Sequence, residues 1–332
     1  MKISKILLCV AVLASFSSGF DVAKNKAKNA KGFKLDAVEW KLPEAMNEDG
    51  TIDESKMGDS PFEKSVILGN KILNFTSKYI GPEAKDSKKR FAKNHLSCSS
   101  CHAKAGTIAN EVGFVGIAAR FPQYNSRADK IITLQDRING CMQRSMNGDV
   151  MPFNSPEMTA MVAYMTWLST NTPVGANTKG QSLPNIEFLD RAADPKKGKE
   201  IYKTRCAYCH GENGEGLKSE SADMDYYIYP AIWGEDSYNT GAGMYRLLKA
   251  AAYIKTNMPQ DKSYALKLDE AYDVAAFINS KPRPIKKDRE ADFPDRDVKP
   301  ADMDVLPYAT HDKASVEQHR FGPFKSLYIN AK

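Results

Sequence analysis

The sequence predicts a mainly α-helical protein made of two small domains of the same type, with an extended N-terminal arm and a C-terminal tail that wraps the surface. Three observations support this prediction. The motif Cys-x-x-Cys-His occurs twice, at residues 98–102 and 206–210. Segments with apolar residues at helical spacing flank each copy. The chain has 332 residues, of which 42% are hydrophobic, and this is enough for two compact cores.

The N-terminus has the pattern of a secretory signal peptide. Lys2 and Lys5 precede an apolar run over residues 6–14, and small residues at 17–19 suit cleavage. The run is too short to span a bilayer as a mature helix, and no other segment has a transmembrane pattern. We therefore expect export to the periplasm without stable insertion into a membrane, and Cys9 would be removed with the signal.

Helix-start signals and chain breakers divide the rest of the chain. Ser60-Pro61 and Ser155-Pro156 are predicted to open helices on either side of the first motif, and Asp194-Pro195 opens one that runs into the second motif. Prolines that alternate with charges near the C-terminus predict a tail without a core of its own. The predicted organisation is a signal peptide (1–20), an N-terminal extension (21–60), a first domain (61–172), a linker (173–193), a second domain (194–282) and a tail (283–332).

The charge of the chain gives no indication of a role in binding large polyanions. The formal net charge is +6, and it falls to +4 when Lys2 and Lys5 leave with the signal peptide. We therefore predict no nucleic-acid partner. Such a balance can attract small dianions only where Arg and Lys gather locally.

The repeated motif has a specific chemistry. Two thiols can form thioether bonds to a haem, and the imidazole that follows the second thiol can reach the iron. A zinc site or a thioredoxin-like pair would also use two cysteines, but two copies between helices, behind a signal peptide, favour haem. The prediction is two covalently bound haem c groups, at Cys98, Cys101 and His102 and at Cys206, Cys209 and His210.

The second unit resembles a small class I cytochrome c over residues 194–282. The matching features include Gly198 and Tyr202 ahead of the motif and Asn257-Met258-Pro259 before the last helix. The resemblance implies that Met258 is the distal iron ligand, which suits a high potential, and that the Pro230 carbonyl holds the His210 ring. The alternative for Met258 is a core-filling side chain.

The first unit has an unpaired cysteine. Two haems would use four of the five cysteines that remain after residue 20 and leave Cys141, which is unusual in an oxidising compartment. Bonding of its thiolate to ferric iron would protect it and lower the haem potential. Met151 imitates Met258 but lies too close to the next helix, so it is the weaker ligand. Five more methionines are expected to pack in the core: Met142, Met146, Met158, Met161 and Met165.

Two strings near Cys141 indicate a family. Asp-Arg-Ile-Asn-Gly-Cys (136–141) and Arg-Ser-Met-Asn-Gly (144–148) resemble the dihaem thiosulfate dehydrogenases, which include members that work well as tetrathionate reductases. The resemblance covers residues 60–282. It implies two cytochrome c folds, with His102 and Cys141 on the first haem and His210 and Met258 on the second. In some members, a Lys beside the distal Met can exchange with it as the iron ligand. Here the neighbouring residue is Asn257, so we expect Met258 alone to be the distal ligand.

The same resemblance implies an oxidoreductase that interconverts two thiosulfates and tetrathionate plus two electrons. Cys141 would loosen from the first iron and engage the sulfane sulfur, and the second haem would pass electrons to an external periplasmic carrier such as a small cytochrome c. Position by position, Arg127, Arg137 and Ser145 match the substrate-contacting residues of the family. Guanidinium groups suit a reaction that brings two dianions together, and Arg144 and Lys130 could assist them.

Alternatives remain open for some residues and for the function. Arg144 has an equal claim to a haem propionate, and Arg120 is expected in an ion pair or on a propionate. His95, His311 and His319 are expected as surface or packing residues, although His95 is close to the first motif. A plain dihaem electron carrier would not need Cys141, whereas a thiosulfotransferase-type subunit of sulfur oxidation would depend on a partner.

Overall fold

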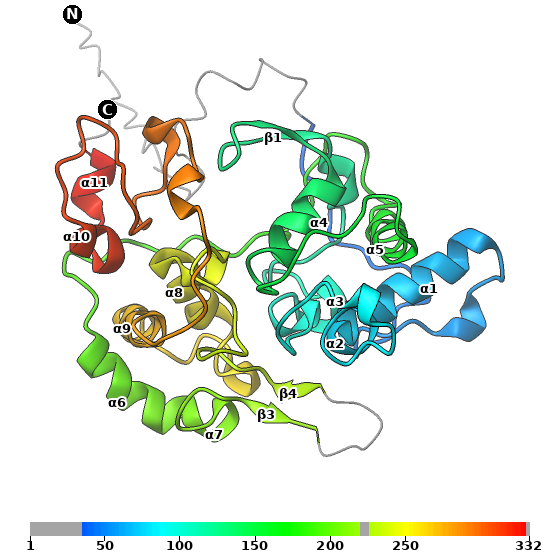
Figure 1. Ribbon diagram of the computed structural model, residues 1–332, viewed down its shortest axis with the longest axis horizontal. Coiled ribbons are helices and arrows are strands. Elements are labelled where there is room, and N and C mark those ends of the chain that lie inside the picture. The colour runs from blue at the N-terminus through cyan, green and yellow to red at the C-terminus, as the bar shows by residue number, and fades with distance from the viewer. Residues whose placement is uncertain (1–34, 220–225, 330–332) are drawn as a thin grey trace, which may run out of the picture.

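A computed structural model describes residues 35–219 and 226–329 (Figure 1). The expected signal peptide and the start of the expected N-terminal extension lie outside the described residues. The fold is mainly helical with two helical bodies, as the sequence predicts. In the described part of the chain, no helix is both long and apolar enough to cross a membrane.

The first body is organised by a pair of packed helices, α1 (Pro61–Asn74) and α5 (Pro156–Trp167). Both begin where the sequence predicts, because the Ser60 and Ser155 side chains accept from backbone N–H groups of the first turn and proline occupies the first helical position. The elements between them are α2 (Thr76–Ile80), α3 (Ala103–Gly106), the antiparallel strands β1 (Gln123–Asn125) and β2 (Lys130–Ile132), and α4 (Leu134–Met142).

The second body repeats this plan with α6 (Pro195–Arg205) packed on α9 (Leu268–Asn279). Asp194 caps α6, as expected. Tyr202, Trp233 and Phe277 form an aromatic cluster between the two helices, with ring centroids 4.9–5.7 Å apart. The other elements are α7 (Ala207–His210), the antiparallel strands β3 (Leu217–Lys218) and β4 (Tyr227–Tyr229), and α8 (Leu247–Asn257), which packs on α9.

One glycine in each body allows the paired helices to approach closely. A Cβ atom at Gly69 of α1 would lie 2.1 Å from the carbonyl oxygen of Ala160, and one at Gly198 of α6 would lie 1.9 Å from that of Asp273. Such distances are far below van der Waals contact, so any other residue would push the helices apart. The two bodies therefore depend on the same packing constraint.

The two bodies meet through polar contacts near the first motif. The backbone N–H of His95 donates to Asp236 Oδ1 at 2.9 Å, and His95 Nδ1 lies 2.8 Å from the same oxygen. Tyr227 donates to Asp236 Oδ2 at 2.7 Å. The side-chain amide of Asn94 donates to the Ser237 carbonyl of the second body at 3.2 Å and to the Ser145 carbonyl of its own body at 2.9 Å. His95 thus has a packing role at the boundary between the bodies.

The C-terminal tail leaves α9 and returns along both bodies (Figure 1). The Thr240 N–H donates to the Pro284 carbonyl at 3.0 Å, and the Phe293 N–H donates to the Arg127 carbonyl at 2.8 Å. Beyond it, α10 (Val316–Phe321) and α11 (Lys325–Ile329) lie against the second body, whose core includes Phe324. One-turn 3-10 helices occupy Glu54–Lys56, Ser87–Lys89, Cys98–Ser100, Ala118–Arg120, Gly243–Tyr245, Gln260–Lys262, Arg289–Ala291 and Arg296–Val298.

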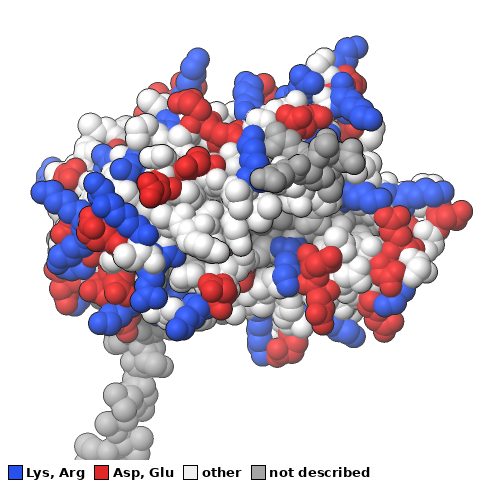
Figure 2. Space-filling view, turned by 90° about the horizontal axis from the view of Figure 1, so that it is seen from below, with Lys and Arg blue, Asp and Glu red and all other residues white. Residues whose placement is uncertain are grey.

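Charges of both signs lie on the face of the molecule that Figure 2 shows. There, Lys and Arg side chains alternate with Asp and Glu around a central area of uncharged residues. Charges interspersed in this way give no extended field of one sign on this face.

The helix crossing of the second body gives a first prediction. Gly198→Ala should destabilise the protein by about 1–3 kcal/mol because the added methyl group meets a main-chain carbonyl. Thermal unfolding of the purified protein measures the effect. Gly243→Ala is the matched control, since a Cβ atom there has nothing within 4 Å. Equal melting temperatures for both variants would contradict the packing constraint.

The contact between the bodies gives a second prediction, on pH dependence. Burial raises the pKa of Asp236, but hydrogen bonds from His95 and Tyr227 outweigh it and hold the pKa below its ordinary value of 3.8. A carboxylate with a lowered pKa contributes stability above pH 3.8 that is lost as the pH falls through its folded-state pKa. The charged groups facing it are His95, Lys218 and, beyond His95, Glu83.

Asp236→Asn should therefore lower the free energy of unfolding by about 2 kcal/mol near neutral pH, and the difference from the wild type should shrink below pH 3.8. Denaturant unfolding across this pH range measures it. A difference that stays constant down to the lowest pH would show that the Asp236 charge makes no contribution.

Candidate functional site

A cavity of about 440 Å³ lies at the first Cys-x-x-Cys-His motif. This volume is within the range of small-molecule and cofactor sites. Cys98, Cys101 and His102 line it together with Cys141 from α4. Apolar side chains from the same body complete this part of the wall, among them Phe114, Leu134, Ile138, Met142, Met146, Met161 and Met165.

Residues from the second body and the tail close the cavity. Tyr238, Met244, Arg246 and Lys249 come from the second body. Phe293, Val298 and Pro300 come from the tail. The segment between the bodies adds Gln181 and Ser182, so four parts of the chain share the cavity.

Cys141 is set apart from the other cysteines by its neighbours. Arg137, one turn earlier on α4, donates to Cys141 Sγ at 2.8 Å. Burial raises the pKa of the Cys141 thiol, but Arg137 and the adjacent His102 ring outweigh it and lower the pKa to about 6. By contrast, burial raises the pKa of Cys98 to about 11 and that of Cys101 to about 12. Among these three thiols, only Cys141 is poised to be a thiolate at neutral pH.

The His102 ring has a fixed orientation. Its Nδ1 atom lies 2.5 Å from the Val112 carbonyl, and the ring packs on Phe114 with centroids 4.3 Å apart. Val112 has a positive φ of 57°, which is uncommon for a β-branched residue and brings its carbonyl to the imidazole. An imidazole held through Nδ1 presents Nε2 to a metal.

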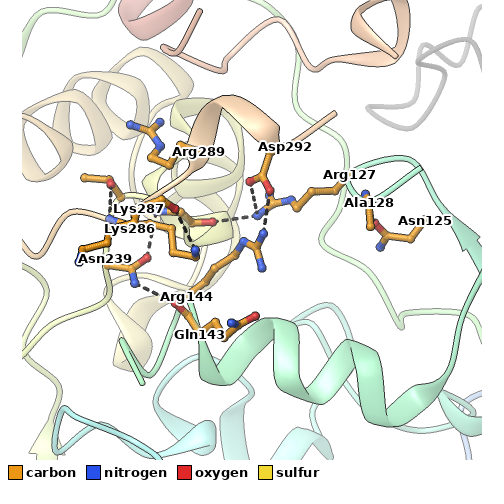
Figure 3. A network of polar contacts seen from close by, with 12 residues as sticks. Asn125, Arg127, Ala128, Gln143, Arg144, Asn239, Lys286, Lys287, Arg289 and Asp292 are labelled. Atoms are coloured by element: carbon orange, nitrogen blue, oxygen red, sulfur yellow. Dashed lines mark hydrogen bonds and ion pairs between the residues drawn. The ribbon is translucent and has the colours of Figure 1, made fainter. Parts of the chain in front are cut away.

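The predicted arginines occupy different positions. Arg127 and Arg137 both line the cavity. Arg127 Nη1 donates to the Gly241 carbonyl at 2.8 Å and lies 3.5 Å from Asp292 Oδ2. Burial lowers the pKa of Arg127 to about 9. Arg144 instead donates to Asp292 Oδ1 at 2.7 Å (Figure 3). It is not among the described residues that line the cavity.

Some of the other predicted polar residues also line the cavity, and some do not. Ser145 lines the cavity, whereas Lys130 is an exposed residue of β2 and does not. Arg120 also lines the cavity and donates to the Gln181 side chain at 2.9 Å. Arg246 and Lys249 also line the cavity, and they were not among the predicted site residues, because no local sequence pattern indicates that the start of α8 faces the first motif.

One predicted contact of the second motif is present in the structure. His210 Nδ1 lies 2.9 Å from the Pro230 carbonyl, which confirms the predicted contact. Burial lowers the pKa of His210 and raises that of Cys206 to about 12. Met258 lies at the C-terminal end of α8 and packs on the core of the second body.

The methionines of the first body also fit the sequence analysis. Met151 is buried and its backbone N–H and C=O both bond to the Asn139 side chain, at 2.8 and 3.0 Å. It is outside the cavity lining in the described part of the chain. These contacts give Met151 a structural role, and the five methionines expected in the core are all part of it.

The residues at both motifs fit haem c. Each has two thiols, an imidazole oriented by a main-chain carbonyl, and buried apolar neighbours. The first also has a third thiol and several cationic groups at its cavity. Within the described residues, no three or more His, Cys, Asp or Glu side chains gather as a metal-ion site would require.

Comparison with known proteins defines the class. Residues 85–174 match the family model described as the SoxA/TsdA cytochrome c domain, and residues 195–281 match that of cytochrome c. The protein is thus a haem-binding c-type cytochrome with two cytochrome c domains.

The relatives define the family. The chain is 38% identical to a thiosulfate dehydrogenase of Allochromatium vinosum, over 70% of this chain and 84% of the relative. It is 37% identical to one of Psychrobacter arcticus, over 74% and 72%. The chain belongs to the thiosulfate dehydrogenase family and is an oxidoreductase that acts on sulfur compounds.

A solved structure agrees. The structure of thiosulfate dehydrogenase (TsdBA) from Marichromatium purpuratum superposes with a TM-score of 0.63 and 31% identity, covering 69% of this chain. The match spans 48% of that chain, about half of its length.

Proposed function

We propose that the protein interconverts thiosulfate and tetrathionate in the periplasm: two thiosulfates yield one tetrathionate and two electrons. The observation that supports this most is the contact between Arg137 and the Cys141 thiol inside a cavity that Arg127 and Ser145 also line. A sulfur nucleophile among cationic groups suits a substrate that is itself a sulfur dianion.

Two covalently bound haem c groups complete the proposal. Cys98 and Cys101 would attach the first, with His102 and Cys141 as iron ligands. Cys206 and Cys209 would attach the second, with His210 and Met258 as ligands. The haems supply one-electron acceptors, the first at the site of sulfur chemistry and the second as the relay to an external carrier such as a small cytochrome c.

The sulfur chemistry balances with Cys141 as the reacting group. The Cys141 thiolate forms a bond to the sulfane sulfur of thiosulfate with the loss of two electrons, which gives a cysteine S-thiosulfonate. A second thiosulfate attacks the same sulfane sulfur, tetrathionate leaves, and the thiolate returns. In the reverse direction the thiolate attacks tetrathionate and releases one thiosulfate.

The polar residues have separate tasks. Arg137 stabilises the thiolate, and Arg127 binds the sulfonate group of the incoming anion. Ser145 is a hydrogen-bond donor at the cavity wall. Arg144, which pairs with Asp292, supports Arg127 rather than contacting the substrate.

A plain electron carrier explains less of this arrangement. It needs neither a thiol beside Arg137 nor a cavity with this many cationic groups. Adding thiosulfate to the oxidised protein and tetrathionate to the reduced protein distinguishes the two functions. The enzyme should change its haem absorption bands in both titrations, whereas a carrier should not respond to either compound.

A third prediction concerns Cys141. Cys141→Gly should abolish turnover of thiosulfate and tetrathionate, because the sulfur nucleophile is lost, while both haems stay attached. Dye-coupled activity and the haem content of the purified protein measure this. Gly140→Ala, in the same helix, should keep its activity, since a Cβ atom there meets only Arg144 Nη1, at 3.9 Å. Full activity without Cys141 would exclude the mechanism.

A fourth prediction concerns Met258. Met258→Leu should remove the absorption of a methionine–ferric iron bond and lower the potential of the second haem, because the thioether ligand is lost. Optical spectra and a redox titration measure both. Met151→Leu is the control and should leave them unchanged, since Met151 lies in the core of the first body. A spectrum unchanged in Met258→Leu would assign that side chain to core packing.

A further inference from the structure

We propose that Asp292, in the C-terminal tail, is a positioning residue that sets the affinity of the cavity for sulfur anions by holding Arg127 in place. This inference rests on the proposed function, because it names what keeps the substrate-binding guanidinium where that function needs it. Asp292 lies outside the region with the family motifs.

The contacts of Asp292 join the tail to two arginines (Figure 3). Its Oδ1 atom accepts from Arg144 Nη2 at 2.7 Å, and its Oδ2 atom lies 3.5 Å from Arg127 Nη1. The Asp292 side chain is only 9% exposed, so water screens these interactions weakly. One carboxylate thus bridges the arginine at the cavity and the arginine behind it.

The arrangement leaves part of Arg127 for a ligand. The Gly241 carbonyl and Asp292 both engage Nη1. The remaining donors of Arg127, Nε and Nη2, can then bind an oxyanion in the cavity. The Arg127 guanidinium also lies over the Phe293 ring, 5.5 Å from its centroid, which further limits its rotation.

The negative charge of Asp292 offsets the repulsion between the arginines around it. Arg144, Arg246 and Arg137 all lower the pKa of Arg127, while Asp292 raises it. Without Asp292, the buried like charges of Arg127 and Arg144 would repel each other. Movement of one of these side chains out of the site would lower this electrostatic energy.

The backbone next to Asp292 has an unusual conformation that fixes its position. Phe293 has a φ of +58°, a left-handed conformation that is costly for an aromatic residue. Its N–H donates to the Arg127 carbonyl at 2.8 Å, and its side chain lines the cavity. Strain of this kind persists where surrounding contacts fix it, and here they fix the residue next to Asp292.

The tail offers a matched comparison. Asp304 pairs with Arg289, and this pair is buried to a similar degree: the side chains are 13% and 14% exposed, compared with 9% for Asp292 and 19% for Arg144. Within the described residues, neither Asp304 nor Arg289 lines the cavity. Asp304→Asn therefore removes a tail ion pair without touching the cavity.

The test compares Asp292→Asn, Asp292→Glu and Asp304→Asn in the full-length dihaem protein. Asp292→Asn should raise KM for thiosulfate and tetrathionate about tenfold with kcat within about twofold, since a displaced guanidinium loses a charge-assisted hydrogen bond to the substrate. Asp292→Glu should recover most of the loss. Asp304→Asn should lower the melting temperature but leave KM unchanged.

The stabilisation of each variant by added thiosulfate in thermal unfolding is a second readout that does not depend on turnover. It should be smaller for Asp292→Asn than for the wild type. An unchanged KM and an unchanged thiosulfate-induced shift in Asp292→Asn would overturn the inference, as would an equal rise of KM in Asp304→Asn. A wild-type protein that turns over neither compound would instead remove the proposed function, and the thermal shift would still decide the role of Asp292.

Discussion

Guanidinium groups that share a partly buried cavity repel one another, and each needs an acceptor to remain charged and in place. Burial first, and then the charges of the neighbouring guanidinium groups, lower the pKa of Arg127 to about 9. One acceptor lies on the same helix as its arginine, and the others come from distant parts of the chain. Arg137 has the Cys141 sulfur, Arg120 has Gln181, and the tail supplies the two carboxylates: Asp292 for Arg127 and Asp302 for Arg246. The tail is therefore part of the electrostatic structure of the site.

The two bodies differ mainly in the chain segment that connects their paired helices. Both depend on a glycine that lets the helices cross closely, Gly69 in one and Gly198 in the other. In the first body the intervening chain forms the β1–β2 hairpin and α4, which places Cys141 beside Arg137. In the second it forms α8, and Met258 follows the last residue of that helix. A common frame thus presents a thiol in one body and a thioether in the other, and as the proposed iron ligands these groups would favour different iron oxidation states.

The sequence predicted what depends on local signals. Capping residues located the starts of α1, α5 and α6, and the pair Arg137 and Cys141 is one turn apart on a single helix. The contact of His210 with the Pro230 carbonyl also followed from a recognisable motif. The position of Arg144 is harder to predict from the sequence, because its partner Asp292 lies 148 positions away. No periodicity or motif indicates that a proline-rich tail returns to the first body, so contacts of this kind need the structure.

Helix α8 explains why the second body contributes to the first site. Arg246 precedes the helix and lines the cavity, Lys249 in its first turn does the same, and Met258 follows its last residue. A helix of 11 residues is about 16 Å long, so one short rigid element fixes the separation between the cavity and Met258. The Asp302 carboxylate anchors its start by accepting from the Arg246 guanidinium and from the Leu248 N–H, the latter at 3.0 Å. Because the tail holds this end as well, a shift of the tail would disturb both Arg127 and the alignment of the two domains along which electrons would leave.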